Sequence, residues 1–175
     1  MHYLYHMVPK DQRGTVLEPL NQLRKSRPDL YAEKVKKYEG REHVMERTIP
    51  ILDCLWNDVL HLSPIPPSDL KTALLEAGME NKEFNFYQID SRSLAPDKTV
   101  VYMHRSTDKL MQPDDNEFVR FSSELLEDIK HVPRISKEYF REKYSAGEKP
   151  LLFIGIPHIL YRGTLDTTNL PVVTV

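Results

Sequence analysis

Apolar residues recur along this chain with two periods, every second residue in some stretches and every third or fourth residue in others. The two-residue period is typical of a strand that faces different surroundings on its two sides. Residues 84–90 show it, because Phe84 and Phe86 alternate with Asn85 and Tyr87. Aromatic and β-branched residues favour strands in five further segments, at 2–8, 99–104, 150–156, 158–162 and 170–175.

Helical spacing appears first between Val16 and Leu23, where apolar residues recur at intervals of three and four and predict a short helix. A second helix is expected to open at Pro28 and to end near Gly40. Residues 105–120 are polar and predict a long loop. Two later helices are expected after capping serines, one from Ser122 or Ser123 to Lys130 and one from Ser136 to Gly147.

The chain is organised around residues 49–78, which contain its only Trp and its only Cys. Residues 54–62 predict a strand that ends in His-Leu-Ser, and the prolines that follow stop any helix or strand. Ser68 is expected to cap a new helix that ends at Gly78. A strand, a proline turn and a short helix in this order predict one wall of a pocket.

About six strands and four or five helices, concentrated early and between strands, predict an α+β fold with a mixed or antiparallel sheet. The 175 residues are expected to form a single globular domain over 1–175. The charged run 33–46 mixes both signs. It predicts a solvated helical face, and a binding surface is the alternative.

Composition and charge narrow the expected partners. A net charge of −2 gives no general attraction to nucleic acid or to an anionic membrane, so neither is the expected partner. No run of about 20 apolar residues predicts a membrane span, and the first residues do not resemble a signal peptide. The expected location is the cytoplasm of the producing cell, or a host cytosol reached by a route without a classical signal peptide.

Candidate chemistry rests on the histidines. A single Cys excludes an intramolecular disulfide, and Cys54 lies in an apolar run typical of a core residue. No metal-binding, serine-elbow, P-loop or dinucleotide-fingerprint motif is present, so no metal site is predicted. Four of the seven histidines lie in or at the end of expected strands and could gather in space, and the alternative is that each is separately buried with a backbone hydrogen bond. These four are His6, His61, His104 and His158.

Several segments, read in order, resemble the ADP-ribosyltransferase-like superfamily. The opening LYHMV is similar to the first strand of these small transferases, and residues 59–63, VLHLS, are similar to a strand of the RNA 2′-phosphotransferases. Residues 86–90 with 100–102 resemble the paired strands that follow, and Val132-Pro133 before Tyr139-Phe140 resembles their exit segment. Together the segments cover about two thirds of the chain.

The resemblance implies a site that binds NAD as a substrate. It implies that His6 contacts the ribose, that His61 or Ser63 binds from the neighbouring strand, and that Tyr87 or Tyr102 stacks on nicotinamide. Tyr5 is expected beside His6, and Arg105 is the candidate for the phosphates. The chain departs from the family after the first-strand histidine and in the helix exit, and no residue is assigned to the family's catalytic glutamate.

Three functions therefore stay open from the sequence. The leading hypothesis is a toxin-like or effector-like protein that binds NAD or a related nucleotide and transfers ADP-ribose to a macromolecule, with a protein as the acceptor. The second is a non-catalytic module of the same fold that recognises a protein partner. The third is an RNA-directed phosphotransferase or nuclease, against which the acidic balance counts.

Overall fold

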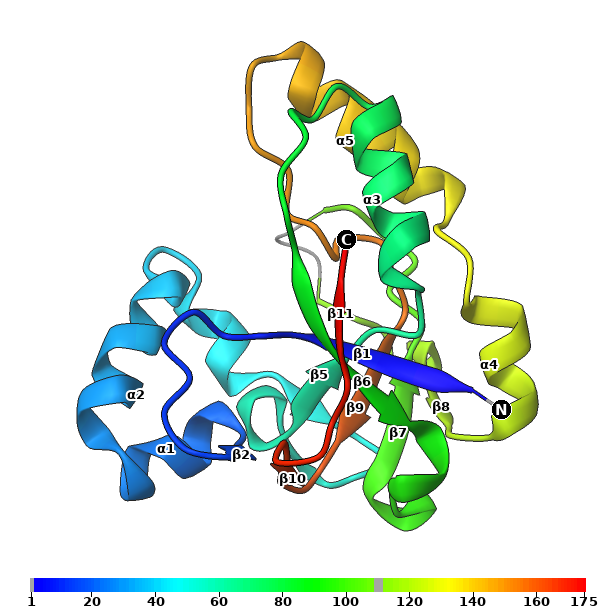
Figure 1. The fold of residues 1–175 in the computed structure, drawn as a ribbon. Coiled ribbons are helices and arrows are strands. Elements are labelled where there is room, and N and C mark those ends of the chain that lie inside the picture. Colours follow the sequence, from blue (N-terminus) through cyan, green and yellow to red (C-terminus); the bar gives the residue numbers. More distant parts are fainter. Residues whose placement is uncertain (1, 109–111) are drawn as a thin grey trace.

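A three-stranded and a four-stranded antiparallel sheet lie at the centre of the computed structural model, which describes residues 2–108 and 112–175 (Figure 1). The first sheet has the order β1-β6-β11, with β1 (Tyr3–Met7), β6 (Asn85–Asp90) and β11 (Val172–Thr174). The second has the order β5-β9-β7-β8, with β5 (Leu60–Leu62), β9 (His158–Tyr161), β7 (Thr99–Tyr102) and β8 (Phe118–Arg120). Two short ladders pair β2 (Val16–Leu17) with β10 (Leu165–Asp166) and β3 (Thr48–Ile49) with β4 (Cys54–Leu55).

A single bridge joins the two larger sheets. Tyr5 of β1 and Ser63, directly after β5, exchange two backbone hydrogen bonds of 2.8 Å each. This pairing sets β1 beside β5, although the two strands lie more than fifty residues apart in the sequence. The histidines of these strands, His6 and His61, are therefore held at the junction of the sheets.

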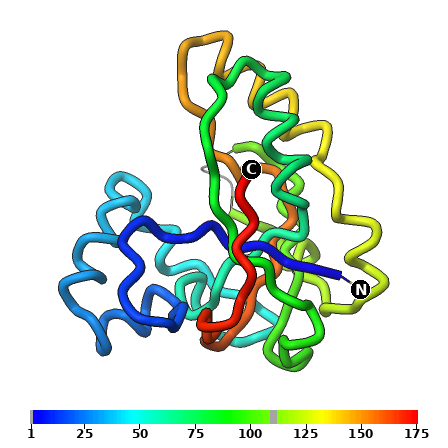
Figure 2. Tube along the Cα trace, viewed as in Figure 1, coloured from blue at the N-terminus to red at the C-terminus, as the bar shows by residue number. Residues whose placement is uncertain are grey.

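The helices gather in separate places around the sheets, as the tube in Figure 2 also shows. The first two, drawn in blue, lie together at the left of the view, and α3 and α5 lie side by side at its top (Figure 1). The α-helices are α1 (Leu20–Ser26), α2 (Pro28–Val35), α3 (Pro67–Glu76), α4 (Ser123–Ile129) and α5 (Arg134–Ser145). Two 3-10 turns also matter for the site, η1 (Lys36–Tyr38) and η3 (Trp56–Asp58).

Apolar packing divides along β6, whose two faces are both buried. Phe86 packs with α3 and α5 around the fully buried Phe140. Its neighbour Tyr87 points to the other face and packs with Leu4 and Ile89. A further apolar cluster surrounds Trp56 and joins η1 and η3 to the four-stranded sheet. This last cluster supports the site described below.

The α+β class predicted from the sequence is confirmed. Strands occur within five predicted segments, 2–8, 84–90, 99–104, 158–162 and 170–175. The helix capped by Ser122 is also confirmed, because the Ser122 hydroxyl accepts a hydrogen bond from the Leu125 N–H at 3.3 Å. In the part of the chain that the structure describes, no helix combines the length and the apolar character that a membrane span requires.

Three predictions in the first half of the chain are wrong. Val16 and Leu17 form strand β2, and the helix begins only at Leu20, because Pro19 separates the two. The strand expected over 54–62 is interrupted by the turn η3. Ser68 does not cap α3, because the helix begins at Pro67, and proline at the first helical position needs no N–H partner.

Three predictions in the second half are also wrong. Residues 150–156 form successive turns, with Gly155 at a φ of +69°, a conformation that a strand cannot contain. Helix α5 begins at Arg134, so Ser136 lies inside it and is fully buried. The loop expected at 105–120 ends in strand β8, which pairs with β7, and its residues 109–111 lie outside the described part of the chain.

Candidate functional site

A cavity of about 370 Å³ opens between the strand junction and the first two helices. His6 and His61 line it from β1 and β5, and His158 lines it from β9. The opposite wall comes from α1, α2 and η1 and carries basic side chains. The cavity lies within the range of about 300–1,000 Å³ typical of small-molecule sites. The two histidine-bearing strands therefore share one wall of a cavity large enough for a small molecule.

The backbone sets the tautomer of each histidine at this cavity. A carbonyl oxygen can only accept, so the ring nitrogen beside it carries the proton. His6 donates from Nδ1 to the Met7 carbonyl at 2.8 Å, and His61 donates from Nε2 to the Trp56 carbonyl at 3.0 Å. His158 donates from Nδ1 to the Ile156 carbonyl at 2.7 Å. The second nitrogen of each neutral ring is left as a hydrogen-bond acceptor.

Burial keeps these rings neutral. It lowers the pKa of His6 to about 4, with Lys34 and Lys37 adding to the effect. Burial and the neighbouring His158 lower the pKa of His61 to about 3. Near pH 7 both rings are therefore uncharged, and each can accept a hydrogen bond from a ligand hydroxyl.

Three of the four strand histidines gather around Trp56 and Tyr102, while His6, His61 and His158 also each make the backbone hydrogen bond that the alternative reading of the sequence expected. The His61 ring lies 4.6 Å from Trp56 and 6.0 Å from His158, measured between centroids. His104 lies 5.2 Å from His158 and stacks on Tyr102 at 5.0 Å. His6 completes the group through the cavity that it lines together with His61 and His158.

A second cavity of about 240 Å³ continues the first along η1. Lys37, Tyr38 and Trp56 line both cavities. Arg47 lines the second cavity, and its guanidinium lies 5.0 Å from the centroid of the Trp56 ring. We call the two cavities together the basic groove, because Arg27, Lys34, Lys37, Arg41 and Arg47 line it.

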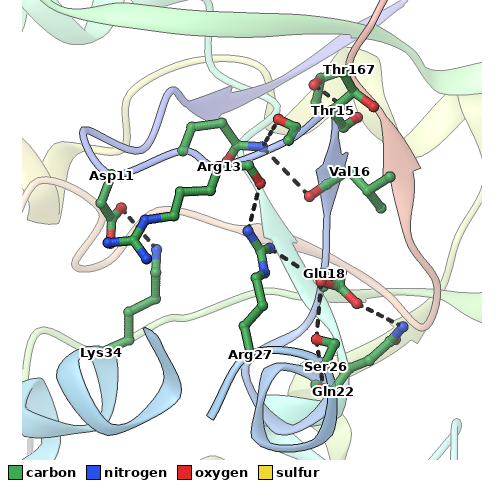
Figure 3. Close-up of polar contacts among 12 residues, drawn as sticks. Asp11, Arg13, Thr15, Val16, Glu18, Gln22, Ser26, Arg27, Lys34 and Thr167 are labelled. Carbon is green, nitrogen blue, oxygen red and sulfur yellow. Dashed lines mark hydrogen bonds and ion pairs between the residues drawn. The ribbon is translucent and has the colours of Figure 1, made fainter. Parts of the chain in front are cut away.

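Two carboxylates of the larger cavity pair with these cations (Figure 3). Glu18 pairs with Arg27 at 3.1 Å, and Asp11 pairs with Lys34 at 3.2 Å. The segment that carries Asp11 forms the outer wall. It is held in place by a hydrogen bond of 2.6 Å that the Arg27 guanidinium donates to the Arg13 carbonyl. The groove therefore combines neutral hydrogen-bond acceptors on its floor with cations on its wall.

Tyr5 and Ser63 lie beside the site rather than in the groove. Both line a smaller cavity of about 110 Å³, which His6 and His61 also line. The Ser63 side chain is buried, and its hydroxyl accepts a hydrogen bond from the Ile65 N–H at 3.1 Å. The structure thus brings four of the seven predicted residues together at the junction of β1 and β5.

The other three predicted residues lie elsewhere. Tyr87 is only 8% exposed, packs in the apolar core and lines neither cavity of the groove, so it cannot stack on a ligand there. Arg105 is exposed and lines a different cavity with Arg134, so it does not serve the groove as a phosphate contact. Tyr102 does line the second cavity, but its ring is packed between His104 and Phe118.

Sequence reasoning missed the residues that give the groove its charge. Lys34 and Lys37 belong to the charged run 33–46, for which a solvated face was the prediction and a binding surface the alternative. The structure turns one side of this run toward the histidines. The spacing of Lys34 and Lys37, three residues apart on a helical segment, is the sequence signal that would have placed them on one side.

Cys54 is half-buried against the Trp56 cluster, and burial raises the pKa of its thiol to about 11, which suits a packing role. Within residues 2–108 and 112–175, no group of three or more His, Cys, Asp and Glu side chains is arranged to hold a metal ion.

Comparison of the chain with protein-family models, curated proteins and solved structures finds no significant match.

Proposed function

We propose that the protein binds NAD or a related nucleotide in the basic groove and transfers ADP-ribose from it to a macromolecule. The meeting of His6 and His61 at one cavity is the observation that carries the proposal. The ordered similarity to ADP-ribosyltransferase-like proteins implies this juxtaposition, and a fold of that type belongs to the same proposal.

The polar groups of the groove match the parts of such a ligand. Ribose presents hydroxyl donors, and the neutral rings of His6 and His61 each offer an acceptor nitrogen. A diphosphate needs cations, and the wall carries several. The two adjoining cavities allow an elongated ligand to lie along η1.

The proposed reaction breaks the bond between nicotinamide and ribose. The electron pair of that bond leaves with nicotinamide, and positive charge develops on the ribose until a nucleophile of the acceptor bonds to the same carbon. The groove would hold ribose and diphosphate in a fixed orientation, which is a large part of catalysis for a displacement of this kind. Glu18 lines the cavity, but we give it no part in the reaction, because its carboxylate already accepts hydrogen bonds from Gln22, Ser26 and Arg27.

Thermal unfolding with NAD tests the proposal. A ligand present at 100 times its dissociation constant stabilises by about 2.7 kcal/mol, which raises the melting temperature of a chain this size by roughly 5–10 °C. His6→Ala and His61→Ala should remove this rise. His2→Ala is the matched control, because His2 lies just before β1 and contacts Glu127 far from the groove.

Two results would contradict the proposal. One is the absence of any rise at millimolar NAD with the folded wild-type protein. The other is an equal rise in wild type and in both groove variants, each shown by circular dichroism to be folded. Chromatography that detects released nicotinamide then distinguishes a reaction, either transfer or hydrolysis, from binding alone.

A further inference from the structure

Two carboxylates of the larger cavity, Glu18 and Asp11, pair with groove cations and are held very differently. Glu18 accepts hydrogen bonds from Gln22, Ser26 and Arg27 at 3.1–3.2 Å, and its side chain is 13% exposed. Asp11 has one partner, Lys34, at 3.2 Å, and its side chain is 35% exposed (Figure 3). Glu18 is therefore part of the scaffold, whereas Asp11 is held by one half-exposed ion pair, the kind that contributes little to stability.

Lys37 lines both cavities of the groove, the second of them together with Asp108. Its ammonium lies 5.0 Å from the centroid of the Tyr38 ring, and no ion pair joins it to an Asp or Glu of the described residues. Partial desolvation, together with the neighbouring cations Lys34 and Arg41, lowers the pKa of Lys37. An anion bound beside Lys37 would relieve this repulsion.

Lys34 and Lys37 also stand in the right relation to act together. They are three residues apart, Lys34 in the last turn of α2 and Lys37 in η1, so they project from the same side of one helical segment. Both line the larger cavity together with His6 and His61. Any anion held between the two ammonium groups would have the acceptor nitrogens of the histidines across the cavity.

We propose that Lys34 and Lys37 form a diphosphate subsite of the basic groove, and that Asp11 occupies this subsite in the ligand-free protein and leaves Lys34 when a diphosphate binds. The inference rests on the proposed function for the identity of the whole ligand, while the subsite itself recognises the diphosphate group. Asp11 thereby acts as an internal competitor that sets the affinity of the groove.

Titration calorimetry with inorganic pyrophosphate, and separately with NAD, tests the subsite. Asp11→Asn removes the competing charge while keeping the shape of the side chain, and it should tighten pyrophosphate binding by up to about five-fold. Asp29→Asn is the matched control, because it removes the same charge from an exposed pair with Arg13 that does not line the cavity. Lys34→Gln and Lys37→Gln should each weaken binding at least ten-fold.

Each result of the calorimetry either supports or overturns the proposed subsite. Tighter binding in Asp11→Asn but not in Asp29→Asn supports the subsite. If Asp11→Asn and Asp29→Asn change the affinity equally, the effect comes from net charge alone and the role of Asp11 is overturned. Pyrophosphate binding that is absent, or that Lys34→Gln and Lys37→Gln do not weaken, would overturn the subsite itself. Pyrophosphate bound at this subsite without any binding of NAD would reject the proposed function and leave the subsite standing.

Discussion

Mild acid should destabilise this protein strongly, because four partly buried histidines stay neutral in the folded state. Burial lowers the pKa of His6 and of His104 to about 4, and it lowers that of His61 and of His158 to about 3, where a neighbouring histidine adds to the effect. In the unfolded chain a histidine has a pKa of about 6.5. At pH values between the folded and the unfolded pKa, the unfolded chain binds protons that the folded protein does not bind.

The sign and size of the effect follow from proton linkage. Above pH 6.5 neither state is protonated, so the histidines cost nothing there. As the pH falls below 6.5, each buried histidine removes about 1.4 kcal/mol of stability per pH unit until its folded pKa is reached. At pH 5 this is about 2 kcal/mol for each ring and about 8 kcal/mol for the four, comparable with a total stability of about 5–15 kcal/mol.

Urea unfolding between pH 7.5 and pH 5 measures this loss, with the single Trp56 as the fluorescent probe. Carboxylates scarcely change charge in this window, since their unfolded pKa values lie near 4. His158→Gln should reduce the slope of stability against pH, whereas His131→Gln, at an exposed position, should leave it unchanged. A free energy of unfolding that stays constant down to pH 5 would refute the neutral, buried histidine cluster.

Two further predictions concern the scaffold of the groove and the turn that replaces an expected strand. Tyr38→Phe should destabilise by about 1–3 kcal/mol in urea unfolding, because the Tyr38 hydroxyl donates to the buried Asn57 side chain at 2.7 Å. A loss below 0.3 kcal/mol would show that this bond contributes nothing. Gly155→Ala should cost more than Gly147→Ala, since both have a φ near +70° but a Cβ at Gly155 would lie 2.9 Å from the Ser136 hydroxyl, whereas nothing lies within 4 Å at Gly147. Equal melting temperatures for the two variants would contradict this.

Local alternation was enough to predict β6 but not to predict its surroundings. The segment Phe84–Ile89 reads as a strand from its period alone, yet the same pattern suggests one buried and one open face. In the structure both faces are covered, Phe86 by α3 and α5 and Tyr87 by the central cluster. Tyr87 was therefore a reasonable candidate for ligand binding from the sequence, but in the structure its side chain is buried in the core.

Turns with an apolar composition are the other source of error. Residues 150–156 are apolar and mostly buried or half-buried, although Leu151 is exposed, and periodicity cannot distinguish a buried strand from a buried succession of turns. The glycine at 155 and the proline at 157 are the local signals that favoured turns. Similarly, Val16 and Leu17 satisfy helical spacing with Leu20 by coincidence, since Pro19 separates two different elements.

The site divides into a part that the sequence predicts and a part that only packing creates. His6 lies in a strand that the sequence predicts, whereas the expectation that His61 would meet it came from the resemblance to ADP-ribosyltransferase-like proteins and not from a local pattern. The basic groove depends on how η1 packs against Trp56 and the four-stranded sheet, a long-range arrangement that no local pattern encodes. For this reason Arg105 was the expected phosphate contact, while Lys34 and Lys37 are the cations that face the histidines.

The most direct test of the account is a crystal structure of the protein with NAD. The account predicts that the nucleotide lies in the basic groove, with ribose hydroxyls within hydrogen-bond distance of His6 or His61 and phosphate oxygens at Lys34 and Lys37. Nucleotide bound outside this groove, or a groove that stays empty at millimolar NAD with its entrance open to solvent, would contradict it.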